Sequence, residues 1–307
     1  MNKNIWTADA VVNAVMQGNP NLEIVISNYF KAFVLRLDDY NISIEGISSI
    51  DELNRKVEDG ITDLETLRKE FISVVGIFAS SNHPTLKKYL PVFFEDLLNH
   101  YEELDVNLYT GTSTDVLRND HYRFFNQFLL ISLVALLIEN QCFDTLQSIL
   151  HTKYKIYYKS YGMIREVNFI RFREYNYTLN QFLNTNTPKR ISVTADYIRA
   201  FSSSSDFAKQ IKADILLYYI SLWQHTDDIF DAYWYPELSV YNRDKEILPK
   251  LISQTYFDKA KVLFGVNNIE EYKALLYGSK DVFERDGRFK VPVLQVGLLY
   301  DKVGSVE

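Results

Sequence analysis

The feature that most constrains the fold is an almost entirely apolar run from Phe124 to Ile138. Its only polar residues are Asn126, Gln127 and Ser132. As a helix the run would be roughly 22 Å long, which is shorter than the roughly 30 Å core of a bilayer. A helix that is apolar on every side is buried inside a protein. We therefore expect a buried central helix at 115–139, capped by Thr114 or Asp115, and no contact with a membrane.

Helix start and stop residues recur on both sides of this run. Glycine and proline are scarce (11 and 7), whereas tyrosine and phenylalanine are abundant (22 and 20), which favours helices with aromatic contacts over a glycine-rich α/β fold. The capping residues predict helices after Thr7, after Asn19-Pro20, from Ser49 to Gly60, from Thr62 to Phe78, from His83-Pro84 to about Leu104, at Asp206–Trp223 and up to Gly265. The sequence thus predicts an all-α fold of antiparallel helices around the buried central helix.

After Leu150 the pattern changes. The segments KYKIYYKSY and VNFIRFREY alternate or cluster aromatic residues, which fits strands, an irregular aromatic loop or a twisted helix. We expect a small β or irregular insertion near 152–175. The chain then divides into a helical N-terminal part, 1–150, which includes the buried helix, and a part at 151–307 with the basic, aromatic segment and C-terminal helices. Its 307 residues, 47% of them hydrophobic, favour one compact unit.

The cellular compartment is indicated by the single cysteine, Cys142, which has no intrachain partner for a disulfide and favours a reducing environment. The first residues, Met1 to Ile5, lack the apolar stretch of a secretory signal. We therefore expect a cytoplasmic protein.

Charge is unevenly distributed along the chain. Basic residues (Lys and Arg) number 9 in 1–117, 11 in 118–200 and 13 in 201–307. The corresponding numbers of acidic residues (Asp and Glu) are 18, 6 and 16. At 151–173 cations and aromatic rings interleave, which suits a single-stranded nucleic acid. The candidate nucleic-acid-binding residues are Lys153, Lys155, Lys159, Arg165, Arg171, Arg173, Tyr157 and Tyr161. Alternatively, the rings pack inward, and the acidic first third neutralises cations that reach solvent.

Three arrangements imitate catalytic motifs, and each departs from the motif it imitates. Residues Asp227-Asp228-Ile229-Phe230-Asp231 read as the DDxxD of diphosphate enzymes but lack a second metal-binding cluster. Arg118 and His121 are closer together than the corresponding pair in helical RNases of the HEPN type. The third arrangement, a nominal metal-nuclease pattern, is Asp258 with Glu271 and Lys273. Glu271 and Lys273 fall in a helix-like run and not on a strand, where both side chains would face one metal. We therefore assign no catalytic residue, no metal site and no cofactor.

An aromatic cluster at Trp234-Tyr235-Pro236 has two interpretations. Exposed Trp and Tyr are frequent at binding hot spots, which makes Trp234 and Tyr235 candidates for partner binding. Alternatively, Pro236 ends a helix and the rings pack the following segment onto the helix at Asp206–Trp223.

Apolar and aromatic residues recur in five segments: HYRFFNQFLLISLVALLIENQCFDTLQSIL, Lys212–Leu217, Tyr233–Pro236 with Tyr241, Tyr256-Phe257 and Leu263–Gly265. Their combination resembles a helical module of uncharacterised bacterial proteins that are often encoded near antiviral defence genes or fused to effector domains. The resemblance covers about residues 60–300, concerns the pattern rather than a motif, and transfers no catalytic residue. It implies a helical sensor, scaffold or regulatory part whose enzymatic partner lies on another domain or chain.

The favoured function is accordingly a bacterial, non-enzymatic scaffold, sensor or regulatory protein that acts through protein–protein contacts in antiviral defence. It would bind a protein partner or form a homo-oligomer. Two alternatives stay open. The first is a nucleic-acid-binding protein that uses 151–173, and the second is a helical RNase or a metal-dependent diphosphate enzyme.

Overall fold

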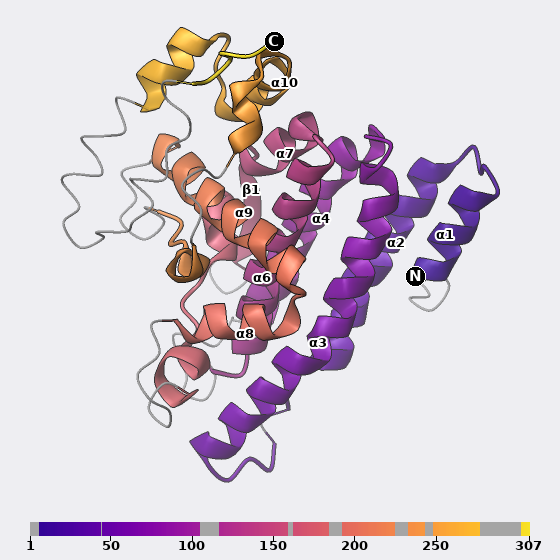
Figure 1. Ribbon diagram of the computed structural model, residues 1–307. Coiled ribbons are helices and arrows are strands. Elements are labelled where there is room, and N and C mark those ends of the chain that lie inside the picture. Colours follow the sequence, from indigo (N-terminus) through magenta and orange to yellow (C-terminus); the bar gives the residue numbers. More distant parts are fainter. Residues whose placement is uncertain are drawn as a thin grey trace.

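The fold is built around helix α6 (Asp120–Glu139), which is buried along most of its length. The computed structural model describes residues 6–43, 45–104, 117–158, 162–183, 192–224, 233–242, 248–276 and 302–307. As the sequence predicts, these residues form an all-α protein with one small two-stranded hairpin (Figure 1).

The central helix differs from the expectation in its length and its start. α6 has 20 residues and passes the length and composition criteria for a membrane span, but 89% of its most apolar window is buried inside the protein. Burial among other helices, rather than a short length, therefore distinguishes α6 from a membrane span. Arg118 and Asn119 form a turn, so the helix begins at Asp120 and not at 115. Thr114 and Asp115 lie outside the described residues.

Helices of the N-terminal part meet in an aromatic cluster. α1 (Ala8–Met16), α2 (Leu22–Arg36) and α4 (Thr85–Leu104) follow the predicted boundaries. Phe30 and Phe33 of α2 each lie 5.1–5.6 Å, between ring centroids, from Phe71 and from Phe93 of α4. The rings of Phe71 and Phe93 are stacked at 4.7 Å. Abundant phenylalanine thus supplies the contacts that join these helices.

Helix α3 (Ile50–Ala79) is continuous over 30 residues, so the prediction that Gly60 ends one helix and Thr62 starts another is wrong. Gly60 lies where α3 passes the start of α6. A Cβ atom at this position would lie 3.2 Å from Cδ2 and 3.3 Å from Cβ of His121. Glycine is used here for a close approach between two helices rather than for a helix end.

The second half of the chain covers other sides of α6. α7 (Phe143–Leu150) packs against α4 and α10 (Gln254–Phe264), while α8 (Val193–Phe201) and α9 (Ser204–Trp223) lie on the side away from α1 and α2 (Figure 1). As predicted, Gly265 ends α10, with a left-handed φ of 67°. Further elements are 3₁₀ turns at Leu37–Tyr40, Phe169–Phe172, Glu237–Tyr241 and Pro249–Ile252, a π-helical turn at Thr178–Leu183 and a helix at 269–276.

The small insertion after α7 is a β-hairpin followed by a 3₁₀ turn. β1 (Tyr154–Tyr158) and β2 (Met163–Val167) pair antiparallel. The edge of β1 that does not pair with β2 is hydrogen-bonded to side chains of α4. Asn99 Nδ2 donates to Lys155 O at 2.8 Å, and Asn99 Oδ1 accepts from Tyr157 N at 2.9 Å. Glu95 Oε2 accepts from Lys155 N at 2.8 Å. These side chains satisfy backbone groups with which a further strand would otherwise pair.

Alanine substitution of the two glycines of α3 tests the role of Gly60. In an open helix interior, Gly→Ala stabilises by about 1 kcal/mol. At Gly76 the nearest neighbour of a new Cβ is Leu136 Cδ1 at 3.9 Å, so Gly76→Ala should raise the free energy of unfolding by up to about 1 kcal/mol. Gly60→Ala should be less stable than Gly76→Ala, because the buried His121 ring must move. Urea denaturation followed by circular dichroism measures both; equal gains would contradict the packing explanation.

Candidate functional site

The hairpin has one face toward the core and one toward solvent. Tyr154, Ile156 and Val167 are buried, so the residues that alternate with them point outward. We define the outer hairpin face as Lys155, Tyr157, Ile164 and Glu166. Tyr157 and Ile164 lie opposite each other and are 47% and 63% exposed. Lys155 lies opposite Glu166. The face thus has an aromatic and aliphatic centre beside two opposite charges.

Sequence reasoning found only part of this face. It identified Lys155 and Tyr157 by the interleaving of cations and rings, but it did not identify Ile164 or the neighbouring Met163, which is also exposed. The alternation of polar and aromatic residues in KYKIYY was the available signal, because it predicts which side chains of a strand share a face. Only the register between the strands shows that Ile164 lies beside Tyr157.

The predicted nucleic-acid-binding residues have different surroundings. Lys153 and Lys155 are exposed at the hairpin, whereas Arg165 is half-buried on its inner face. Lys159 and Tyr161 lie outside the described residues. The basic segment is therefore not one uniformly exposed stripe over the part that the structure describes.

Arg171 and Arg173 form ion pairs within the protein. Arg171 pairs with Glu174, and Arg173 Nη2 lies 3.3 Å from Glu237 Oε1. The Arg173 guanidinium also lies over the ring of Tyr235, 5.0 Å from its centroid. Both carboxylates come from outside the basic segment, so counting charges within the segment overstated the cations available to a ligand.

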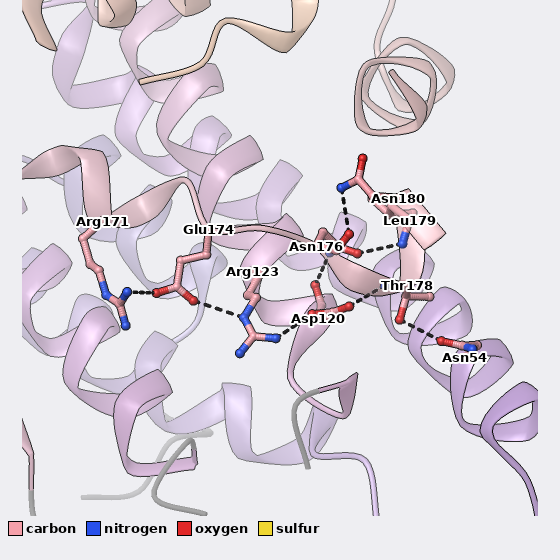
Figure 2. A network of polar contacts seen from close by, with 9 residues as sticks. All are labelled: Asn54, Asp120, Arg123, Arg171, Glu174, Asn176, Thr178, Leu179 and Asn180. Atoms are coloured by element: carbon pink, nitrogen blue, oxygen red, sulfur yellow. Dashed lines mark hydrogen bonds and ion pairs between the residues drawn. The ribbon is translucent and has the colours of Figure 1, made fainter. Parts of the chain in front are cut away.

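Figure 2 shows the network to which Arg171 belongs, at the start of α6. Glu174 Oε2 also accepts from Arg123 Nε at 3.1 Å, and Arg123 Nη1 donates to Asp120 Oδ1 at 2.6 Å. Asp120 is fully buried. Burial raises the pKa of the Asp120 carboxyl, and the charge of Arg123 opposes this effect. The Asp120–Arg123 ion pair is thus buried inside the fold and not exposed to solvent.

The same network fixes the chain that follows the basic segment (Figure 2). Thr178 N donates to Asp120 Oδ2 at 2.6 Å, and Thr178 Oγ1 donates to Asn54 Oδ1 at 3.0 Å. Asn176 Nδ2 donates to Asp120 O at 2.7 Å. These buried bonds connect α6, α3 and the π-helical turn, so the network contributes to the stability of the fold.

His121, one residue of the RNase-like pair, is enclosed in the core. Its Nε2 lies 3.0 Å from Tyr40 O, and its ring lies 3.9 Å from the Tyr122 ring, between centroids. Burial lowers the pKa of His121 to about 3. The Arg118–His121 pair therefore presents no exposed imidazole that could act as an acid or base on RNA.

The other motif-like residues do not form a metal site where the structure describes them. Glu271 Oε2 accepts from Asn267 N at 2.8 Å, as in a helix cap, and Asp258 Oδ1 accepts from Lys261 Nζ at 3.2 Å. Residues 227–231 lie outside the described part of the chain. Among the described residues, no three His, Cys, Asp or Glu side chains are placed to hold a metal ion.

Trp234 is fully buried, so its ring is not presented at the surface. Its indole Nε1 donates to Asp214 Oδ1 at 2.7 Å, and its backbone N donates to Ser221 Oγ at 3.0 Å. Leu238 N donates to Asp214 Oδ2 at 2.8 Å. Asp214 and Ser221 belong to α9, so Trp234 packs the segment after Tyr233 onto this helix. Tyr235 is half-buried beside Arg173.

Comparison with protein-family models gives no match, and neither the curated proteins nor the solved structures give one.

The buried Asp214 predicts a pH effect on stability. Burial raises the pKa of its carboxyl from the ordinary 3.8 to about 7, with Glu237 acting in the same direction and Arg173 against it. A raised pKa means that the stabilising contribution is complete below 3.8 and is lost as the pH rises through about 7. Asp214→Asn removes this titration, so its free energy of unfolding should fall less steeply between pH 4.5 and 7, by about 1 kcal/mol per pH unit.

Urea denaturation of both proteins across this pH range measures the difference. Ser205→Asn, at an exposed and uncharged position of the same helix, is the control and should keep the wild-type slope. Equal slopes for wild type and Asp214→Asn would show that Asp214 does not titrate in this range.

Proposed function

We propose that this protein is a non-enzymatic helical scaffold or regulatory protein that binds a protein partner through the outer hairpin face. The observation that carries the proposal is the exposed Tyr157–Ile164 pair. Aromatic and other large side chains at the centre of an interface contribute most of its binding energy. The bonds from Asn99 and Glu95 to β1 hold these two side chains on a rigid support.

The charges favour a protein over a nucleic acid. A polyanion gains affinity from cations that replace its counterions, but Lys155 lies opposite Glu166, and Arg171 and Arg173 pair with carboxylates. A rim with both signs of charge around an apolar centre is typical of protein interfaces. The exposed Lys153 then contributes to partner choice and association rate.

A role in bacterial antiviral defence belongs to the same proposal. It is supported by the resemblance of the chain's helical pattern to modules of defence-associated proteins. Such modules are often encoded near antiviral defence genes or fused to effector domains, so the expected partner is an effector chain rather than a second copy of this protein.

The test is capture of the partner from the native organism by tagged protein, followed by mass spectrometry. Ile164→Asp places a charge at the centre of the face and should reduce recovery of the partner at least tenfold, because a buried unpaired charge is strongly unfavourable. Ile24→Asp is the matched control, since Ile24 lies on α2 and is 57% exposed. It should leave recovery unchanged. Equal recovery with both variants would contradict the assignment of this face.

Nucleic acid and self-association are the competing outcomes. Fluorescence anisotropy with single-stranded RNA should show no salt-sensitive binding. The double variant Lys153→Glu with Lys155→Glu should give the same anisotropy as wild type. Salt-dependent binding that this double variant removes would replace the protein-partner proposal with the nucleic-acid alternative. An Ile164-dependent dimer in analytical ultracentrifugation would replace the separate partner with a second copy.

A further inference from the structure

The part of the chain that the structure describes also contains a hollow where α3, α6 and the start of α9 meet. Its volume is about 500 Å³, which is in the range of small-molecule sites. Ile72 of α3, Leu136 of α6 and Phe201 of α8 give it apolar walls. We call this hollow the α9 pocket. It is formed by other residues than the outer hairpin face.

The floor of the α9 pocket is polar and built from buried side chains. Arg68, Ser132 and Gln210 are 6%, 5% and 4% exposed. Arg68 Nη1 donates to Ser132 Oγ at 2.9 Å, and Gln210 Nε2 donates to the same oxygen at 3.3 Å. Ser202 Oγ donates to Gln210 Oε1 at 2.7 Å. Helices α3, α6 and α9 therefore place these polar groups at one point of the pocket.

The floor has more hydrogen-bond donors than acceptors. Ser132 Oγ accepts twice, but its own proton is donated to no described atom. Gln210 donates one of its two amide protons. Arg68 donates once from each of Nε, Nη1 and Nη2, so each Nη retains a second N–H. These remaining protons line the hollow, where a ligand that supplies acceptor atoms could bond to them.

Charge selects among the ligands that have acceptor atoms. Arg68 forms a bidentate pair with Glu65, with Nε–Oε2 and Nη2–Oε1 distances of 2.6 Å, and Lys69 Nζ lies 3.3 Å from Glu65 Oε1. At the mouth, Lys209 Nζ lies 2.7 Å from Glu139 Oε1. Each of these cations thus has a carboxylate partner. An anion would have to compete with these carboxylates, whereas an uncharged ligand would not.

We propose that the α9 pocket binds a small uncharged organic ligand whose carbonyl oxygens accept hydrogen bonds from Ser132, Gln210 and Arg68. The apolar side of the ligand lies against Leu136 and Phe201. Rings with amide or imide groups have this chemistry, since they combine a flat apolar surface with carbonyl acceptors. The inference does not depend on the proposed function, because a ligand in this pocket requires no partner at the hairpin.

Calorimetric titration of the whole chain with three probes tests this proposal. Nicotinamide and uracil are uncharged rings with amide or imide oxygens, and inorganic phosphate is the anionic probe. At least one uncharged probe should bind with a Kd below about 5 mM, and phosphate should bind more weakly than that probe. Ser132→Ala should weaken binding of the probe about three- to tenfold, as expected for one hydrogen bond.

Two further variants separate the pocket from general effects on the protein. Ala135→Leu fills the pocket from its apolar wall and should abolish binding without changing the polar floor. Ser148→Ala makes the same serine change on α7, outside the lining residues, and should leave Kd unchanged. Gln210→Met, which conserves volume, replaces Ser132→Ala as the test of the floor if the latter does not unfold cooperatively.

Failure of both uncharged probes to bind overturns the proposal. Binding that persists unchanged in Ser132→Ala and Ala135→Leu places the probe elsewhere and overturns it too. Phosphate binding tighter than that of both rings would contradict an uncharged ligand. Capture of a protein partner should be the same for Ala135→Leu and wild type, so failure of this inference is distinguishable from failure of the proposed function.

Discussion

Every other part of the described structure depends on the need to bury α6 on all sides. An apolar helix can be covered in many ways, because apolar contacts are not directional. The few polar side chains of α6 select among them. Asp120 and Arg123 bond the segment after the basic stretch at the start of the helix, and Ser132 bonds α3 and α9 near its middle. Since a buried polar group is costly unless it is bonded, these three residues contribute to how the neighbours are placed.

Local signals predicted most helix boundaries, because a cap acts within one turn of the chain. Thr7 accepts from Ala10 N, and Gly265 ends α10, as their sequence context indicates. The prediction at Gly60 is wrong because glycine is required there by a contact with His121 on another helix, which the neighbouring sequence does not reveal. The candidate site shows the same division. Tyr157 was identified from its neighbours in sequence, whereas the exposure of Ile164 depends on strand register and the pairing of Arg173 on a distant carboxylate.

Two buried ionisable groups affect the pH dependence of stability in opposite directions. Asp214 favours folding in its protonated, neutral form, because its pKa is raised to about 7. His121 favours folding in its unprotonated, neutral form, because its pKa is lowered from 6.5 to about 3. Between pH 3.8 and pH 6.5, acidification increases the contribution of Asp214 to stability and decreases that of His121. The contributions of these two groups to stability therefore change with pH in opposite directions.

The bonds from α4 to the hairpin have a consequence for solubility. A surface strand with free backbone groups is a template for other strands, and this is how many proteins aggregate. At β1, Asn99 and Glu95 already occupy the N–H and C=O of Lys155 and the N–H of Tyr157. A foreign strand could add at this edge only after breaking those bonds. The hairpin can thus expose apolar side chains for binding, while the hydrogen-bonded edge of β1 does not act as a template for fibril-like growth.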